Sequence, residues 1–297
     1  MASLPYPVPA HVAPDRVVDV DIYDLPGAVQ DVHEAWKALA SEHELIWSPR
    51  NGGHWIATSA ATVARLYRDT EFFSNREISV PAGTMLLPQL PIMKDGGAHR
   101  AYRAVIEPAF KPSALERYRR RAQALTVELI EGFRSAGRCE FIGDYASVLP
   151  VAVFLTMMDL PLADRDVLHG YAQVMIHDAD LAQRHAVFGK IIDYLEAKIA
   201  ERQANLGDDL LSRVIQAEVF GRRLTHEELL GTASLLMFGG LDTVTSMMGF
   251  VMLFLARNPD HRQWMIDYPA SARPQSRRLC AGTVSATIYV RQLPTSR

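Results

Sequence analysis

The chain has 297 residues, of which 48% are apolar and 22% charged, and its formal net charge is −3. A chain of this length and composition can bury a large core, and its small negative charge argues against a nucleic-acid partner. Two cysteines exclude a disulfide-stabilised secreted scaffold. The first ten residues contain three prolines and lack a signal-peptide pattern, so we predict an extended arm over residues 1–20 and a cytoplasmic protein.

The first half of the chain predicts a small sheet followed by a helix and a loop. Two strand-like runs, Leu45–Ser48 and His54–Ala57, flank Pro49–Gly53, whose residue types are those of a hairpin turn. Helical spacing follows over Ala60–Asp69. The segment Val80–Pro91 contains three prolines and is predicted to be a loop.

Most of the remaining chain has helical spacing. Two long helical stretches are predicted over Pro112–Ser135 and Asp164–Asn205, and the regions around Gly137 and Pro161 separate them. The predicted fold class is therefore mainly α with a small β-sheet near the start of the chain.

The most apolar segment, Leu229–Ala256, contains 28 residues and one ionisable side chain, that of Asp242. A capping box over Thr225–Glu228 precedes it, and the helix can continue to Asn258, so we predict one long, buried central helix. A membrane span is disfavoured, because it would place a carboxylate, three threonines and two serines in lipid without basic flanks.

Two glycines, Gly239 and Gly240, lie inside this helix, and each costs a helix interior about 1 kcal/mol relative to alanine. Helical spacing places Gly239, Asp242, Thr243 and Ser246 on one face. Such a face lets a ligand approach the backbone and offers it a carboxylate and hydroxyls. The alternative is a close helix–helix crossing, which glycine also permits.

The stretch Gly239-Gly-Leu-Asp-Thr-Val244 resembles the oxygen-activating motif of the cytochromes P-450, the haem-thiolate monooxygenases. The likeness is closest to the soluble, camphor-hydroxylase-like bacterial branch and covers residues 21–267. Five other stretches agree with that branch in order and spacing: Asn51–Thr58, Glu71–Asn75, His99–Arg103, Phe141–Pro161 and Asp208–Ser212.

The resemblance implies the N-terminal two-thirds of the cytochrome P-450 fold and haem as the cofactor. It implies that Asp242 and Thr243 deliver protons for oxygen activation, and that Gly239 and Gly240 leave room over the porphyrin. His99 and Arg103, spaced i,i+4, would bind the haem propionates, although an ordinary exposed basic helix face has the same pattern. The residues expected to line an apolar substrate pocket, each of which is as easily a core residue, are Met85, Leu86, Leu87 and Phe238.

The resemblance also implies an activity for the full-length form. It would hydroxylate a small apolar, terpene-like substrate with O2, take electrons from a ferredoxin-type donor, and need neither nucleic acid nor a membrane. A basic run over Lys111–Arg121 suits an acidic redox partner, and a plain solvated helix is the alternative.

The cysteine that holds the iron in this family belongs to a loop of the form Phe-x-x-Gly-x-x-x-Cys-x-Gly, downstream of the central helix. Cys280 is followed by Ala-Gly, but Arg273 and Ser276 occupy the Phe and Gly positions, and Cys280 comes only 37 residues after Thr243. The other cysteine, Cys139, precedes the central helix. We therefore expect no metal ligand among the residues of this chain.

The Glu-x-x-Arg pair that the family places beside the haem loop is also missing. Glu116–Arg119 and Glu131–Arg134 have the right spelling but precede the central helix. Charge pairs at i,i+3 are common on solvated helices, so we interpret both as ordinary surface pairs.

The last thirty residues carry five arginines and no acidic residue, unlike the rest of the chain. We predict a partial cytochrome P-450 domain over 21–267 and a non-homologous, out-of-frame tail over 268–297; a basic interaction arm is the alternative. The chain is accordingly expected to be truncated and inactive. The alternative function is that of a non-catalytic helical remnant which binds an apolar ligand or an acidic partner protein.

Overall fold

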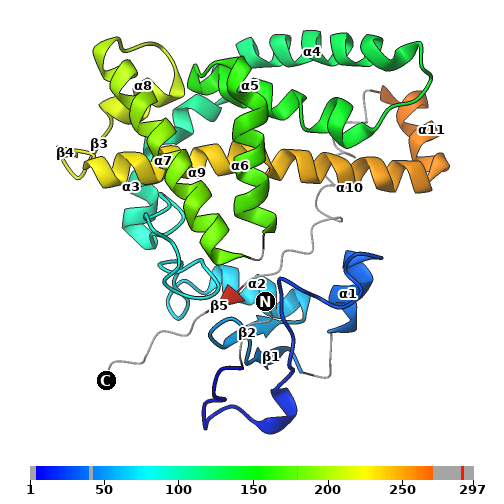
Figure 1. Ribbon diagram of the computed structural model, residues 1–297, viewed down its shortest axis with the longest axis vertical. Coiled ribbons are helices and arrows are strands. Elements are labelled where there is room, and N and C mark those ends of the chain that lie inside the picture. The colour runs from blue at the N-terminus through cyan, green and yellow to red at the C-terminus, as the bar shows by residue number, and fades with distance from the viewer. Residues whose placement is uncertain (1–4, 40–42, 179, 270–288, 291–297) are drawn as a thin grey trace. The chain divides into compact units, whose positions relative to one another are not determined.

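The computed structural model describes residues 5–39, 43–178, 180–269 and 289–290. The chain divides into two compact units. Unit 1 comprises 1–103, 179–181 and 286–297, and unit 2 comprises 104–178 and 182–285. Unit 1 carries the three-stranded sheet, and unit 2 carries most of the helices (Figure 1).

The sheet of unit 1 is antiparallel, with strand order β1-β2-β5. β1 (Leu45–Ser48) pairs with β2 (His54–Ala57) in a register that places Ile46 opposite Ile56. The predicted hairpin is thus confirmed residue for residue. β5 (Tyr289–Val290) pairs with the other edge of β2.

The N-terminal arm is tied to β1. It contains a single 3-10 turn, η1 (Pro14–Arg16), and Val17 then forms a parallel bridge with Trp47. The Ser48 hydroxyl donates a hydrogen bond to the carbonyl of Val20 at 2.5 Å. The arm is therefore attached to β1 near its C-terminal end, at Val17–Val20.

Three helices accompany this sheet: α1 (Val32–Ala38), α2 (Ala60–Arg68) and α3 (Gly96–Ile106). The predicted helix over 60–69 is confirmed in α2, whose N-cap Ser59 accepts a hydrogen bond from the amide of Thr62. Between α2 and α3 the chain forms the predicted loop. The core of unit 1 consists of Val20, Leu25, Ala35, Ile46 and Ile56.

The described residues of unit 2 are helical apart from one hairpin of two-residue strands. The predicted helix over 112–135 is confirmed, whereas the stretch 164–205 forms two helices with a break near Asp178. The elements that follow α3 are η2 (Glu107–Phe110), α4 (Pro112–Arg134), the π-helix η3 (Ile142–Ala146), α5 (Leu149–Met158), η4 (Leu162–Asp164), α6 (Arg165–His177), α7 (Leu181–Ala204), α8 (Leu210–Gln216), β3 (Glu218–Val219), β4 (Arg222–Arg223), α9 (His226–Leu241), α10 (Thr243–Arg257) and α11 (Pro259–Asp267).

The central helix is interrupted. α9 and α10 lie end to end, drawn yellow to orange in Figure 1, but Asp242 between them has φ −130° and ψ −40° and leaves the helical ladder. The capping box of Thr225 and Glu228 opens α9 as predicted. The prediction of one continuous helix is wrong at Asp242, where the carbonyls of Gly239 and Leu241 are contacted by the side chains of Thr243 and His169.

Burial differs between the two halves of the central helix. Nine residues of α9 are buried under α5, α6 and α8, whereas Thr245 alone is buried in α10. The prediction of a buried helix is therefore correct for α9 and wrong for α10. The main contacts of α10 are with η3, α9 and α11, so its side chains Val244, Met252 and Leu253 stay exposed.

By length and composition alone, the helical stretch His226–Arg257 could cross a membrane. Core helices of proteins that never enter a membrane meet the same criterion, and α9 has nine buried residues. Membrane insertion therefore does not follow from this helix.

Candidate functional site

The junction of α9 and α10 is held by side chains that take the place of backbone donors. The last carbonyls of a helix lack intrahelical partners. Here the Thr243 hydroxyl donates to the carbonyl of Gly239 at 2.7 Å, and the Nδ1 of His169 lies 3.2 Å from the carbonyl of Leu241. The interruption between α9 and α10 is thus stabilised by hydrogen bonds of its own.

The interruption separates residues that helical spacing placed together. Gly239 and Thr243 are exposed on one side of the junction, which we call the open face, whereas Asp242 is only 5% exposed. The prediction of a single face for Gly239, Asp242, Thr243 and Ser246 is therefore wrong. The backbone leaves the helical conformation at Asp242, so the 100° step per residue does not carry through it.

The carboxylate of Asp242 accepts hydrogen bonds from polar side chains of α6 and α10. Oδ1 accepts a hydrogen bond from the Nε2 of Gln173 in α6 at 2.6 Å, and Oδ2 accepts one from the Ser246 hydroxyl at 3.3 Å. A buried carboxylate needs such donors, because an unpaired buried charge is costly. Asp242 and Ser246 are therefore brought together as predicted, on the side of α6.

Gly239 and Gly240 have different surroundings, so a glycine is present at the two positions for different structural reasons. A Cβ on Gly240 would stand 2.1 Å from the Cγ of Phe154, so α9 crosses α5 at very close range. A Cβ on Gly239 would meet no heavy atom within 4 Å. The close crossing of α9 and α5 accounts for the glycine at position 240. A role of Gly240 at a cofactor stays a prediction. Gly239 lies on the open face.

Two residues that contact the junction, His169 and Gln173, were not among the predicted site residues. They are spaced i,i+4 on α6 and so extend from the same side of that helix. This spacing of two polar residues is the only indication in the sequence, and it does not reveal which helix they meet.

The residues predicted to bind the propionates lie on α3 in unit 1. His99 is half-buried and Arg103 is exposed. In the described part of the chain, neither side chain is engaged in an ion pair or a side-chain hydrogen bond. The helix at this position is confirmed.

The predicted substrate-pocket residues belong to different units. Met85 and Leu87 are half-buried and Leu86 is 55% exposed, all three in the loop of unit 1. Phe238 lies in unit 2, where its ring stacks on that of Phe188 in α7 with centroids 6.2 Å apart. Their assembly into one pocket stays a prediction.

Cys139 is exposed and unpaired, and Cys280 lies outside the described residues. Among the residues described, no group of three or more His, Cys, Asp or Glu side chains could hold a metal ion.

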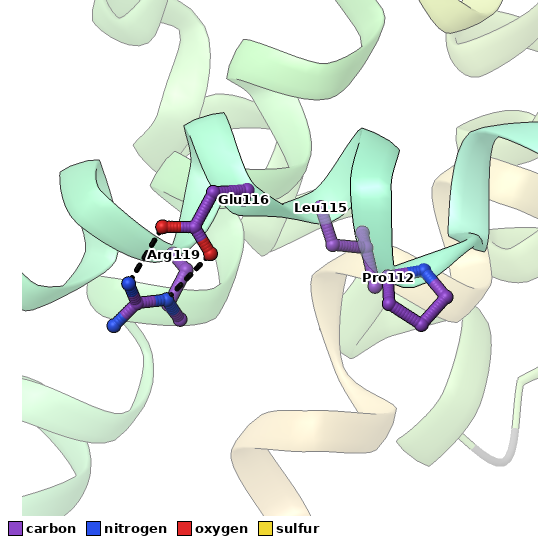
Figure 2. A pocket seen from close by; sticks show the side chains of 4 residues that line it. All are labelled: Pro112, Leu115, Glu116 and Arg119. Carbon is purple, nitrogen blue, oxygen red and sulfur yellow. Dashed lines mark hydrogen bonds and ion pairs between the residues drawn. The ribbon is translucent and has the colours of Figure 1, made fainter.

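The Glu-x-x-Arg pairs are surface features, as the sequence analysis interprets them. In α4, Glu116 forms two hydrogen bonds with Arg119 at 2.6 and 2.8 Å, and Glu131 pairs with Arg134 at 2.7 Å. Figure 2 shows the first pair beside Pro112 and Leu115, at an open surface pocket of about 530 Å³. Nothing in the pair is buried, so it does not lock a core.

Comparisons with known proteins give one consistent result. The sequence profile of the cytochrome P-450 family matches residues 172–290, which extends beyond Asp267. A probable cytochrome P-450 127A1 of Sinorhizobium fredii is 30% identical over 275 residues, which are 89% of this chain and 66% of that protein. The erythromycin C-12 hydroxylase of Saccharopolyspora erythraea is 31% identical over 235 residues, 76% of this chain and 58% of that enzyme.

Solved structures agree with the sequence comparisons. The crystal structure of cytochrome P-450 CYP101C1 superimposes with a TM-score of 0.77 and 37% identity, covering 89% of this chain and 67% of that one. The crystal structure of CYP101J2 gives a TM-score of 0.76, 34% identity and the same coverage. The chain thus spans about two-thirds of the length of these proteins, with their fold and with identities above 30%. It belongs to the cytochrome P-450 family.

Proposed function

We propose that this chain carries the oxygen-activating and haem-edge portion of a monooxygenase that hydroxylates a small apolar, terpene-like molecule. The observation that carries the proposal is the α9–α10 junction, where an exposed glycine and threonine adjoin a buried carboxylate. A purely structural helix crossing explains Gly240 but not the open face beside it.

The residues present fit haem, the cofactor of the family. An added Cβ on Gly239 would meet no heavy atom within 4 Å, so the open face leaves room for a ligand at this position. His99 and Arg103 offer nitrogen donors one helical turn apart, which suits two carboxylates of one ligand. We propose that these two side chains hold the propionates.

Haem, when bound, supplies the redox chemistry by which the family activates oxygen. The Thr243 hydroxyl, exposed on the open face, can hold a water molecule there while its hydrogen bond to Gly239 fixes its position. Asp242 can accept a proton at its carboxylate and release it toward Thr243, because the two residues are adjacent at the junction. Both roles are part of the proposal.

The wider setting follows from the same family membership. We propose a cytoplasmic protein that receives electrons from a ferredoxin-type donor and uses neither nucleic acid nor a membrane. The segment Lys111–Arg121 supports an acidic partner, since Arg120 and Arg121 are exposed on α4. Met85, Leu86, Leu87 and Phe238 are proposed to contact the apolar substrate.

The 297 residues contain no Phe-x-x-Gly-x-x-x-Cys-x-Gly loop. We therefore propose that these residues by themselves form no thiolate-ligated haem and do not hydroxylate substrate. The boundary at Asp267 stays a prediction: the change in composition supports it, whereas the family match to residue 290 and the strand Tyr289–Val290 weigh against it.

The experiment is a titration of the purified protein with hemin, followed by reduction under carbon monoxide. We expect hemin to bind without a thiolate-type Soret band. The double variant His99→Ala, Arg103→Ala should weaken hemin binding about tenfold or more, since hydrogen bonds to charged groups contribute about 1.5–3 kcal/mol each. Arg100→Ala on the same helix is the matched control and should bind as the unaltered protein does.

Two results would contradict the proposal. Equal hemin affinity in the double variant and in Arg100→Ala would remove the propionate assignment. A thiolate-type band that disappears in Cys280→Ser would show that the chain supplies the iron ligand itself. Absence of any hemin binding would favour the second candidate, a non-catalytic helical remnant whose exposed Val244, Met252 and Leu253 on α10 bind an apolar ligand.

A further inference from the structure

An open cavity of about 450 Å³ lies in unit 2, where α4, the end of α5 and the start of α8 meet. In Figure 1 these three helices lie in the same part of the unit, and α5 contacts both of the others. Its volume is within the range of small-molecule sites, which is about 300–1,000 Å³. We call this cavity the α4–α8 pocket; its lining includes the buried Tyr118, Met157 and Leu210 and the exposed Arg120 and Arg213.

The carboxylates that line the α4–α8 pocket are already engaged by neighbouring side chains. Each of the three accepts at least one hydrogen bond, so its charge is compensated before any ligand arrives. Figure 2 shows the first of these pairs, in which the carboxylate and the guanidinium face each other. The pairs are Glu116 with Arg119 at 2.6 and 2.8 Å, Asp208 with Arg117 at 3.0 Å, and Asp209 with the Ser212 hydroxyl at 2.6 Å.

Two guanidinium groups at the same pocket are not engaged in this way. In the part of the chain that the structure describes, Arg120 of α4 and Arg213 of α8 form neither a hydrogen bond nor an ion pair. Two like charges beside one small space repel each other, and a bound anion removes that repulsion. The planar donors of arginine fit the oxygens of phosphate and carboxylate groups. The pocket therefore offers an anion two uncompensated positive charges.

The rest of the lining suits an apolar group. Met157 is 7% exposed, Leu210 2% and Tyr118 8%, so these side chains form the buried floor of the pocket beneath the exposed arginines. Apolar surface that a ligand covers here is removed from water, which favours binding. An inorganic anion would leave this floor uncovered, whereas an organic anion would cover it.

We propose that the α4–α8 pocket binds a phosphate monoester with an apolar body, whose phosphate contacts Arg120 and Arg213 and whose body lies on the apolar floor. Two guanidinium groups match the double charge of such a phosphate near neutral pH, whereas a carboxylate would neutralise only one of them. No residue of α9 or α10, and neither His99 nor Arg103, lines this pocket. The site is therefore a second ligand site, separate from the one proposed for haem.

Calorimetric titration of the purified protein with 1-naphthyl phosphate tests this assignment at about pH 7.5, where the phosphate is mostly a dianion. We expect saturable binding of one ester per chain. Two further probes separate the contributions, since 1-naphthoate has the same ring with a single charge and inorganic phosphate has the charge without the ring. Each should bind at least about tenfold more weakly than the ester.

Arg120→Gln and Arg213→Gln should each weaken the binding of 1-naphthyl phosphate about tenfold, because each removes a charge-assisted hydrogen bond. Arg121→Gln is the matched control: it removes the same charge from the next residue of α4, which is exposed and does not line the pocket, so affinity should stay unchanged. Ser113→Phe adds bulk at an exposed residue of the lining without a change in charge, and it should also weaken binding.

An equal loss of affinity in Arg121→Gln and in the two pocket variants would overturn the proposal, since it would report general attraction to the charge of α4. Equal affinity for inorganic phosphate and for the ester would remove the apolar body. Unchanged affinity in Ser113→Phe would place the ester outside the pocket, and absence of saturable binding would remove the site.

Lipid head groups carry the same phosphate chemistry, so flotation with vesicles that contain phosphatidic acid forms a second arm of the experiment. We expect the soluble ester to bind and the vesicles to show no dependence on Arg120 and Arg213. Vesicle binding that is lost in the double variant Arg120→Gln, Arg213→Gln, without calorimetric binding of the soluble ester, would assign the two arginines to a membrane surface and overturn the proposal.

Discussion

Gly240 of α9 faces the ring of Phe154 in α5 so closely that an added Cβ would stand 2.1 Å from its Cγ. The adjacent Gly239 has no atom within 4 Å of the same position. One glycine of the pair is therefore needed for packing, and the other leaves a surface free. This difference makes the two positions a matched pair for mutation.

Gly240→Ala should lower the free energy of unfolding by about 3 kcal/mol, because the ring of Phe154 cannot move away without disturbing the core. Gly239→Ala should raise it by about 0.5–1 kcal/mol, since alanine favours the helix and meets no obstruction. Urea unfolding of the two variants checks both signs. Equal destabilisation would mean that both glycines serve the helix crossing.

Thr245→Val should lower the free energy of unfolding by about 1–2 kcal/mol. Its hydroxyl donates to the carbonyl of Ala146 at 3.0 Å, and both residues are buried, so the variant leaves an unpaired acceptor. Thr243→Val, two residues earlier and exposed, should change stability by no more than about 0.5 kcal/mol. A large loss of stability in Thr243→Val would show that the main role of the Thr243 hydroxyl is to stabilise the α9–α10 junction.

Thr225→Ala should destabilise α9 by about 1 kcal/mol, because Thr225 accepts from the amide of Glu228 while the Glu228 carboxylate accepts from the amide of Thr225. Thermal unfolding measures this loss. Glu227→Gln, in the same helical turn but outside the capping box, is the control and should cost only about a few tenths of a kcal/mol. A similar loss of stability in both variants would mean that the negative charge in the first turn of α9, and not the capping box, is responsible.

Protonation of Glu77 in acid should weaken its hydrogen bonds to Ser79 and Gly83 and so destabilise the loop. Burial opposes ionisation of Glu77, but hydrogen bonds from Ser79 and from the amide of Gly83 at 2.7 Å outweigh it and lower the pKa below 4.5. A lowered pKa in the folded chain stabilises the loop above the unfolded value and loses that stabilisation as the pH falls through the folded value. The window therefore lies below pH 4.5.

The amide proton of Gly83 reports this change by NMR. Its chemical shift should titrate with a midpoint below 4.5, and the titration should vanish in Glu77→Gln. Glu71→Gln, at an exposed position of the same segment, should leave the curve unchanged. A midpoint above 4.5 would mean that burial, and not the hydrogen bonds, dominates at Glu77.

Local features of the fold could be predicted from the sequence. The hairpin of β1 and β2 follows from strand-like runs and turn residues within thirteen positions, and the Thr225–Glu228 capping box is a pattern of four. Each of these depends on residues that are neighbours in the chain.

The candidate site could be predicted only in part, because its geometry depends on distant segments. His169 and Gln173 contact the junction from 72 and 69 positions away, and these contacts accompany the interruption that turns Asp242 off the open face. A glycine is likewise needed at position 240 because Phe154, in another helix, lies so close to it. Helical spacing within one segment contains no information on such partners.

The strand β5 has a consequence for association between chains. Tyr289 and Val290 pair with Ile56 and Trp55 and cover the outer edge of β2. Without them, β2 would present a row of unpaired amides and carbonyls, which is a template for strands of other molecules. Tyr289 and Val290 thus cover the edge of β2 at Trp55 and Ile56, and proteolytic removal of these two residues should leave that edge open to strands of other molecules.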